Sequence, residues 1–586
     1  MSTLESRTRG ATLAVVFVAG ALLAACTEEP PSLPSASAVA DRFLESWAGE
    51  DFSTMASLLD DASARAWPAR RLARTIAAVN SSGAITDVRL ERSAPVEQPR
   101  IDSAEELDDD ISVDVPFTLD YTSDASSEPV SFAGSLRMTY DGAERGWRFD
   151  WSKRLLWPGT PRAAGFEIRL RYPKRAPILD RRGRKLATGG ADGRRYPFGV
   201  VGGSTVGHVG ALTRADLSDA PEGSEEGDIV GDSGLERAYD DRLSGTPTTR
   251  LTLVTRKGKS IEVVGRTRGR PGRALRTTLD AEVQRAAEGA FGSTVGGAVV
   301  LDPRAGDLLA IVSSAPFDPN NYAGATDIVP FNRALSGLYP PGSSMKVVTA
   351  SAALDTGVMT PGSIVTGPKE YKGVSNFESG VFGEIPFSTA VQNSVNTAFA
   401  QVAERLGGRR LTRYAEAFGF NREPDMHLQT ATPSFPRPES LSDLMWGSIG
   451  QAQVVATPLE MATIAATVAN DGKRMEPRID RGVSKRGERV ISTKTARTMN
   501  TLMQQVVQAG TGVNAQISGV AVAGKTGTAE ISVDGKIKNH AWFVCFAPAE
   551  RPRVAVAVVS EFGGIGGQVA APIARNVLVN VLPLVR

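Results

Sequence analysis

The sequence predicts a multidomain protein of the α+β class, and three observations support that prediction. The chain has 586 residues, and at roughly 150 residues per domain this length corresponds to about three or four units. Apolar residues at helical spacing come first and are followed by stretches in which apolar and polar residues alternate, as in strands. The C-terminal half combines hairpin patterns with apolar helices, so we expect separate mixed domains rather than one core.

The composition argues against several classes of function. The 66 Lys and Arg residues balance 65 Asp and Glu, so the formal net charge of +1 provides no attraction for nucleic acid. Two cysteines cannot form a disulfide scaffold, and three histidines (His208, His427 and His540) leave little for a metal cluster or for catalysis by histidine. We therefore expect no metal and no cofactor, and we expect any nucleophile to use another kind of base.

Residues 1–26 have the pattern of a secretory signal peptide, in which a start with two arginines precedes an apolar stretch. The stretch ends in Leu23-Ala24-Ala25-Cys26, which resembles a bacterial lipobox. That resemblance implies that Cys26 is lipid-modified and is the first residue of the mature protein. An ordinary signal peptide that happens to end in cysteine is the alternative. In both cases the body is exported, and no later apolar run approaches the ~18 residues of a membrane span.

Residues 27–36 indicate a Pro- and Ser-rich tether, and residues 37–157 indicate a first folded domain. Two helices are predicted, one with Val39, Phe43 and Trp47 at helical spacing and one around Met55. Alternating stretches at 111–121, 130–140 and 147–151 predict strands. Helices followed by a meander give an α+β cone, which resembles the NTF2-like N-terminal domain of low-affinity penicillin-binding proteins. We interpret its aromatic stripe as core and assign no site to it.

Residues 158–275 indicate an elongated, β-rich domain and a linker. The segment from Arg175 to Ala187 predicts a hairpin around a charged turn at Gly183. It resembles the signature of the pedestal, or dimerisation, domain of penicillin-binding proteins, with Ala176 in place of the usual glycine. Residues 234–240 resemble the same family, and their Arg and Glu are expected to form structural ion pairs. The basic stretch 266–276 is expected to be a solvated linker.

Residues 276–586 indicate the last domain. A helix capped near Asp280 precedes a hairpin whose strands are 297–301 and 308–312. The strand-like run 553–559 and the helix-like run 572–582 complete the pattern of a five-stranded antiparallel sheet with helices on its faces.

A nucleophile, an amine and a helix start coincide between Tyr339 and Lys346. A Pro-Pro-Gly turn leads into small and apolar residues, which predicts that Ser343 lies at the N-terminus of a buried helix. Residues three apart share a helical face, so the Lys346 amine can reach the Ser343 hydroxyl, and helix-terminal amides favour negative charge there. Ser343 and Lys346 are therefore a candidate nucleophile and base, although Ser-x-x-Lys alone arises by chance about once in a chain of this length.

Two further short motifs follow in other structural contexts. Ser394-Val395-Asn396 precedes an apolar-periodic helix, which places a hydroxyl and an amide at a loop tip. Lys525-Thr526-Gly527-Thr528 follows small apolar residues and indicates an edge strand whose glycines permit close approach of a substrate. Taken singly, each member has a structural alternative: a helix cap at Ser343, a snorkelling surface amine at Lys346, a turn residue at Asn396, an edge-strand charge at Lys525.

The order and spacing of Ser343-x-x-Lys346, Ser394-x-Asn396 and Lys525-Thr526-Gly527 match the three signatures of penicillin-recognising serine enzymes. Segments 446–451, 457–459 and 541–543 extend the match, so residues 276–586 resemble the transpeptidase domain of a class B penicillin-binding protein, with looser similarity over 37–275. The nearest kind is an actinobacterial penicillin-binding lipoprotein. The resemblance implies a serine penicillin-recognising transpeptidase fold, with an all-helical subdomain beside the five-stranded sheet.

The resemblance also implies a role for each residue. Ser343 forms an acyl-enzyme with a stem peptide ending in D-Ala-D-Ala, and the backbone N–H groups of Ser343 and Thr528 stabilise the oxyanion. Ser394 passes a proton to the leaving amine, and Asn396 holds the amide backbone of the substrate. Lys525, Thr526 and Thr528, with Gly527 between them, bind the terminal carboxylate. A free Lys346 amine at neutral pH requires burial or a neighbouring positive charge, which Lys525 can supply.

We therefore expect a monofunctional peptidoglycan D,D-transpeptidase that β-lactams acylate. It would be lipid-anchored at the outer face of the cytoplasmic membrane, with a membrane glycan polymerase as partner, because no glycosyltransferase half precedes residue 275. Alternatives with the same chemistry are a D-Ala-D-Ala carboxypeptidase, a β-lactamase and a β-lactam sensor. An alternative of another class is a catalytically silent scaffold lipoprotein of the cell wall.

Overall fold

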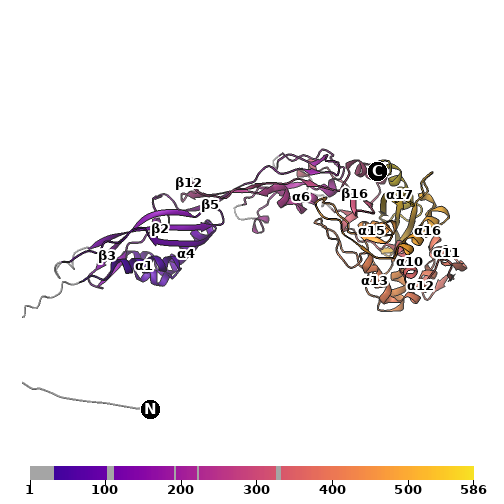
Figure 1. Ribbon diagram of the computed structural model, residues 1–586, viewed down its shortest axis with the longest axis horizontal. Helices are drawn as coiled ribbons and strands as arrows, with labels where there is room; N and C mark the ends of the chain where they lie inside the picture. The colour runs from indigo at the N-terminus through magenta and orange to yellow at the C-terminus, as the bar shows by residue number, and fades with distance from the viewer. Residues whose placement is uncertain (1–31, 102–110, 191–192, 221–223, 325–330, 586) are drawn as a thin grey trace, which may run out of the picture. The chain divides into compact units, whose positions relative to one another are not determined.

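The computed structural model describes residues 32–101, 111–190, 193–220, 224–324 and 331–585. The predicted signal peptide and Cys26 lie outside those residues. Among the described residues, no helix is both long enough and apolar enough to cross a membrane. The chain divides into two compact units, Met1–Ile168 with Arg250–Arg266 and Arg169–Thr249 with Thr267–Arg586 (Figure 1).

The first unit is built from helices followed by an antiparallel sheet in the order β1-β2-β3-β4. Its helices are α1 (Ala36–Ala48), α2 (Phe52–Ser57), α3 (Asp61–Ala66) and α4 (Ala69–Ser82). Its strands are β1 (Ile85–Arg92), β2 (Ser112–Ser123), β3 (Val130–Asp141) and β4 (Gly146–Phe149). The predicted helices α1 and α2 and the predicted meander are confirmed. Helix α4 was not predicted, although its buried Leu72, Ile76 and Val79 recur at helical spacing.

Aromatic side chains fill the space between the helices and the sheet of this unit. Phe43 stacks on Phe149 with ring centroids 4.1 Å apart, and Trp47 meets Trp151 edge to face at 6.2 Å. All four rings are buried. The prediction that the aromatic stripe is core is therefore confirmed. A second sheet, in the order β12-β11-β5, pairs β5 (Gly165–Arg171) with the hairpin of β11 (Thr248–Val254) and β12 (Ser260–Arg266).

The second unit begins with short elements around the predicted hairpin, whose strands β6 (Ile178–Leu179) and β7 (Lys185–Ala187) turn at Gly183 with φ +86°. The other short helices and strands of this part are α5 (Gly203–Val206), β8 (Val209–Ala211), β9 (Ile229–Gly231), α6 (Gly234–Ala238), α7 (Asp240–Ser244), β10 (Gly245–Thr246), β13 (Arg270–Pro271) and β14 (Leu275–Arg276). Strand β13 pairs with β10, and β14 pairs with β6. The basic stretch 266–276, predicted to be a solvated linker, thus pairs part of its backbone with neighbouring strands. Solvent exposure of its side chains does not prevent this, because the pairing uses backbone groups only.

A buried ion network holds this part of the second unit together. The carboxylate of Glu236 is fully buried and accepts from Arg175 Nε at 2.8 Å and from Arg194 Nε at 2.7 Å. A buried charge is tolerated only when it is paired in this way. The prediction of structural ion pairs at this segment is confirmed for Glu236, whose arginine partners come from outside the segment.

A five-stranded antiparallel sheet forms the centre of the second unit, in the order β16-β15-β25-β24-β23. Its strands are β15 (Gly296–Asp302), β16 (Asp307–Ser313), β23 (Ala523–Val533), β24 (Lys536–Ala547) and β25 (Val554–Ser560). On β24, Ala541, Phe543 and Cys545 join the core beneath α8 (Ala281–Phe291) and α17 (Ala570–Val581), while Trp542 and Val544 face the opposite side. The predicted sheet with helices on both faces is confirmed, and β23 is its edge strand.

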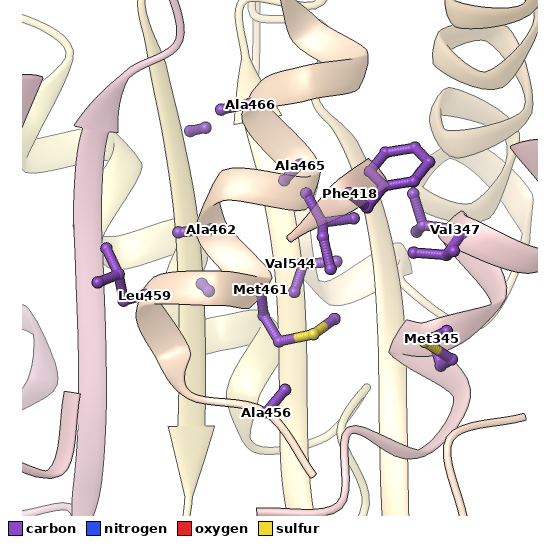
Figure 2. Packing of buried hydrophobic residues seen from close by; sticks show 14 of the residues in the cluster. Met345, Val347, Phe418, Ala456, Leu459, Met461, Ala462, Ala465, Ala466 and Val544 are labelled. Atoms are coloured by element: carbon purple, nitrogen blue, oxygen red, sulfur yellow. The ribbon is translucent and has the colours of Figure 1, made fainter. Parts of the chain in front are cut away.

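Helix α15 (Pro458–Ala469) packs between that opposite face and the helical part of the unit. Figure 2 shows Met461 and Ala465 of α15 in one cluster of buried side chains with Val544 of the sheet and Val347. Its first turn is capped because Thr457 Oγ1 accepts from the Glu460 backbone N–H at 3.1 Å. The core therefore extends without interruption from the sheet to the segment that carries the candidate nucleophile.

A group of helices beside the sheet forms the helical part, in which Figure 1 labels α10, α11, α12 and α13. The remaining helices are α9 (Arg333–Ser336), α10 (Lys346–Asp355), α11 (Phe387–Gln392), α12 (Asn396–Leu406), α13 (Gly408–Phe418), α14 (Leu441–Ser448) and α16 (Thr493–Ala509). Short strands pair locally: β17 (Ile364–Gly367) with β20 (Gly383–Pro386), β18 (Glu370–Tyr371) with β19 (Val374–Ser375), and β21 (Lys473–Met475) with β22 (Gly487–Arg489).

Candidate active site

Ser343 lies in a single 3₁₀ turn, Gly342–Met345, that leads directly into α10. Its side chain is partly exposed, whereas the following turn of α10 is buried. Two contacts hold the approach to this turn: Gly342 N donates to Gly450 O at 2.9 Å, and Trp542 Nε1 donates to Pro340 O at 2.9 Å. The predicted position of Ser343 at the start of a buried helix is confirmed.

Glycines let the nucleophile turn touch the edge strand. Gly342 has φ +51°, and a Cβ there would lie 2.6 Å from Thr528 O. Gly450 has φ +73°, and a Cβ there would lie 2.2 Å from Gly342 O. Only glycine fits such approaches without displacing backbone. The backbone of the Ser343 turn therefore lies directly against Thr528 of β23.

The amine of Lys346 points at the motif that precedes α12. Its Nζ donates to Ser394 O at 2.7 Å, to Ser394 Oγ at 3.2 Å and to Asn396 Oδ1 at 2.6 Å. Within the described part of the chain, the Ser343 hydroxyl is not among the hydrogen-bond partners of this amine. The structure thus brings Lys346, Ser394 and Asn396 together from two helices.

Lys525 reaches the same hydroxyl from the edge strand. Its Nζ donates to Ser394 Oγ at 2.8 Å and to Thr526 O at 3.0 Å. Lys525 and Lys346 are each 1% exposed. Two buried amines therefore converge on one serine.

Burial changes the proton affinity of both amines. Loss of hydration holds the pKa of Lys346 well below its usual range, and the positive charge of Lys525 lowers it further. Burial lowers the pKa of Lys525 to about 7. A neutral lysine amine is therefore available near neutral pH, and a neutral amine has a lone pair that can accept a proton.

Ser394 has an unusual backbone conformation. Its φ of +58° lies in the left-handed region that non-glycine residues rarely adopt. The surrounding turn fixes it, because Ser394 N donates to Val391 O at 3.2 Å and Val395 N donates to Ala390 O at 3.0 Å. Backbone strain of this kind, maintained by neighbouring contacts, is typical of functional sites.

A cavity of about 390 Å³ opens over these residues. The predicted residues on its wall are Ser343, Ser394, Asn396, Thr526 and Thr528. Lys346 and Lys525 are buried and hydrogen-bond to the Ser394 of that wall, and Gly527 is a buried residue of β23 between the two threonines. Every predicted site residue except Cys26, which lies outside the described residues, is thus found at one place.

Two hydroxyls on the edge strand are oriented by neighbours. Thr526 Oγ1 shares a hydrogen bond with Thr511 Oγ1 at 2.6 Å, and Thr528 Oγ1 accepts from Gly566 N at 3.2 Å. Hydroxyls and backbone amides in such positions, close to a lysine, can bind a carboxylate.

Other wall residues were not predicted as part of the site. They are Ser375, Asn376, Phe377, Glu378, Phe382, Asn393, Val395, Trp446, Ile449, Gln451, Thr511, Glu530, Ile565 and Gly567. Trp446 and Gln451 lie in a segment that matches the family but has no role assigned from sequence. Thr511 and Asn376 belong to no recognisable motif, so no sequence signal could have found them.

Three family models match the chain in succession. The penicillin binding protein transpeptidase domain matches residues 296–579. The penicillin-binding protein dimerisation domain matches residues 191–277. The NTF2-like N-terminal transpeptidase domain matches residues 35–161.

Individual relatives agree with these models. The peptidoglycan D,D-transpeptidase PbpA of Mycolicibacterium smegmatis is 34% identical over 397 residues, which cover 60% of this chain and 79% of that protein. The crystal structure of Pseudomonas aeruginosa PBP2 in complex with WCK 5153 has a TM-score of 0.60 and 28% identity, covering 71% of this chain and 96% of that chain. The penicillin G acyl-enzyme complex of penicillin-binding protein A from M. tuberculosis has a TM-score of 0.57 and 30% identity. The match covers 70% of this chain and 99% of that chain. Because three domain models match in order and a relative 34% identical is covered over 79% of its length, this chain belongs to the class B penicillin-binding proteins.

Proposed function

We propose that this protein is a peptidoglycan D,D-transpeptidase that cross-links the cell wall through an acyl-enzyme on Ser343. The observation that carries the proposal is the convergence of two buried amines on Ser394 beside the Ser343 turn. The names of the relatives, which include a peptidoglycan D,D-transpeptidase and a penicillin G acyl-enzyme complex, support the same chemistry.

In the first step, the Ser343 hydroxyl attacks the carbonyl carbon between the two D-Ala residues of a stem peptide. The Lys346 amine takes the hydroxyl proton, because burial and the charge of Lys525 lower its pKa and so favour the neutral form that can accept a proton. The backbone N–H groups of Ser343 and Thr528 would stabilise the oxyanion, and the contact of Gly342 with Thr528 supports that pairing.

In the second step, the bond from that carbon to the nitrogen of the last D-Ala breaks. Ser394 donates a proton to the leaving amine and is replenished by Lys346 or Lys525, both of which are within hydrogen-bond distance of its hydroxyl. An amine of a second stem peptide then attacks the ester carbon, forms the cross-link and releases Ser343.

Recognition of the substrate would use the edge of the sheet. An extended peptide can add to the free side of β23 by backbone hydrogen bonds, while Asn396 holds its amide backbone. Its terminal carboxylate would lie between Thr526, Thr528 and Lys525, at the backbone of Gly527. The hydrogen bonds that orient both threonine hydroxyls support this assignment.

A labelling experiment tests the catalytic proposal. A fluorescent penicillin should form a stable adduct with the wild type and none with Ser343→Ala. Ser344→Ala is the matched control, because the neighbouring Ser344 is fully buried and its hydroxyl has no hydrogen-bond partner among the described residues. Mass spectrometry should place the penicilloyl group on Ser343. Equal labelling of wild type and Ser343→Ala would disprove the enzyme proposal, and loss of label within minutes would instead indicate a β-lactamase.

We further propose that the mature protein is a lipoprotein anchored to the outer face of the cytoplasmic membrane through Cys26, with a membrane glycan polymerase as partner. The lipobox-like sequence supports the anchor. The proposed order is signal peptide 1–26, tether 27–36, N-terminal domain 37–157, pedestal 158–275 and transpeptidase domain 276–586. Mass spectrometry of the membrane-associated protein tests the anchor, and an unmodified Cys26 would refute it.

A further inference from the structure

Helix α12 starts at a catalytic motif but has no cap of its own. Its first residue is Asn396, and the residue at the N-cap position is Val395, whose side chain carries no oxygen. The first N–H groups of a helix have no partner inside the helix and need an acceptor from elsewhere. The conformation of Ser394 and Asn396 therefore depends on whatever supplies that acceptor.

Asn376 supplies it from the loop after β19. Its Oδ1 accepts from Thr397 N at 3.0 Å and from Thr397 Oγ1 at 3.2 Å. Its Nδ2 donates to Pro368 O at 2.8 Å and to Gly380 O at 2.8 Å. Asn376 is 6% exposed, and these four bonds use the whole donor and acceptor capacity of its amide.

The same loop also holds the side chain of Asn396. Asn396 Nδ2 donates to Ser375 O at 2.9 Å, and Asn396 Oδ1 accepts from Lys346 Nζ at 2.6 Å. The Ser375 carbonyl, one peptide bond before Asn376, thereby determines which end of the Asn396 amide faces the lysine. Asn376 is thus connected to the base by the peptide bond to Ser375 and then by two hydrogen bonds through Asn396.

The loop that follows Asn376 also forms part of the wall of the active-site cavity. Phe377, Glu378 and Phe382 line the cavity, and Glu378 and Ser379 have φ values of +51° and +57°. Non-glycine residues keep a positive φ only when surrounding contacts hold the backbone in that conformation. The bond from Asn376 Nδ2 to Gly380 O spans this turn and provides such a contact.

We propose that Asn376 is a positioning residue for acylation: by capping α12 and fixing Ser375, it sets the orientation of Asn396 and Ser394 and through them of Lys346. The inference rests on the proposed function of Ser343 as the acylated residue. Asn376 lies on the cavity wall, but its amide hydrogen-bonds to Thr397, Pro368 and Gly380, so we assign it an effect through the residues that it orients.

A double-mutant cycle tests the inference through the second-order rate constant of acylation by a fluorescent penicillin. Asn376→Ala should lower that rate constant about tenfold in the wild-type background, because small misplacements of reacting groups are costly. In an Asn396→Ala background the same change should lower the rate constant by a clearly smaller factor, since one of the two residues through which Asn376 acts is already gone. An equal factor in both backgrounds would overturn the proposal.

Gln401→Ala is the matched structural control. Gln401 lies on α12, the helix that Asn376 caps, and is 8% exposed. Its Nε2 donates to Thr366 O at 2.7 Å and to Thr397 O at 2.9 Å. Its removal should lower the thermal midpoint as Asn376→Ala does but change acylation of the folded protein less than about twofold. A loss of acylation as large as that of Asn376→Ala would show that Asn376 has no special role.

Asn376→Asp keeps an oxygen that accepts from Thr397 N but removes the two N–H donors to Pro368 O and Gly380 O. The variant therefore separates the capping of α12 from the hydrogen bonds that hold the loop. It should acylate within about threefold of wild type, because a carboxylate is also a good cap. An Asp variant about tenfold or more slower than the wild type would overturn the capping role, and this readout does not require Asn376→Ala to fold. Failure of the wild type to acylate on Ser343 would instead refute the proposed function.

Discussion

Lys346 and Lys525 donate to the same oxygen, Ser394 Oγ, at 3.2 Å and 2.8 Å. Because both amines are buried, a positive charge on one raises the free energy of charging the other. The two lysines are therefore a coupled pair. Proton transfer at Ser343 depends on the charge of Lys525 as well as on Lys346 itself.

Removing the charge of Lys525 should move the pH dependence of acylation. In Lys525→Gln one of the two causes that depress the pKa of Lys346 is lost, so that pKa rises while the effect of burial remains. Below the new pKa the base is protonated and inactive, so the acidic limb of the pH–rate profile should move to higher pH. Acylation rates of wild type and variant between pH 5 and 9 check this. Lys525→Arg retains the positive charge, so the acidic limb of its pH–rate profile should stay where it is in the wild type. If the acidic limb of Lys525→Gln also stayed at the wild-type position, the coupling of the two lysines would be disproved.

Gly450→Ala should impair acylation far more than an equally strained substitution elsewhere. A Cβ at Gly450 would lie 2.2 Å from Gly342 O and would push the Ser343 turn away from β23. Gly357 has φ +72°, and a Cβ there would have no atom within 4 Å, so Gly357→Ala carries only the backbone strain, about 1 kcal/mol. We expect at least about a tenfold loss of acylation rate for Gly450→Ala. Similar rates for the two variants would show that this contact does not position the nucleophile.

Glu460→Gln should stabilise the protein at alkaline pH but not at acid pH. Burial raises the pKa of Glu460 to about 7 from its ordinary 4.5, although Arg474 opposes the shift. Between those values the folded chain keeps a proton that the unfolded chain has lost, so this group's contribution to stability falls as pH rises through the window. Glutamine is neutral throughout, so at pH 8 the variant should be more stable by on the order of 3 kcal/mol.

Thermal unfolding at pH 5 and pH 8 measures that difference. The gain at pH 8 should fall to roughly a quarter at pH 5, and it should vanish only below the ordinary pKa of 4.5, where both folded and unfolded chains hold the proton. Glu416→Gln is the control, because Glu416 is exposed and its substitution should change neither midpoint. A loss of stability by Glu460→Gln at both pH values would mean that the charged form is stabilised after all.

The sequence was sufficient for the elements whose pattern is local. Four of the five strands of the sheet contain apolar runs, whereas β23 is recognised from the small apolar residues before Lys525. The motifs at Ser343, Ser394 and Lys525 lie at the starts of helices or on this edge strand. The partners of Lys346 were beyond such reasoning. Spacing along one helix suggested a contact with Ser343, whereas tertiary packing directs the amine to Ser394 and Asn396.

Other features depend on contacts that no periodicity encodes. Asn376 caps a helix that begins twenty residues later, and a single asparagine in a loop gives no sign of that role. The stretch 266–276 is basic and indicates solvated side chains, but composition does not reveal that its backbone pairs with β10 and β6. Such pairings are decided by the fold as a whole.

The burial of the two lysines has a consequence for the medium in which the protein works. Dissolved ions screen exposed charges beyond about 8 Å at physiological ionic strength but screen buried ones much less. With each lysine 1% exposed, the mutual influence of Lys346 and Lys525 is shielded from salt. An enzyme outside the membrane would thus keep the same proton chemistry whether the surrounding fluid is dilute or rich in counterions.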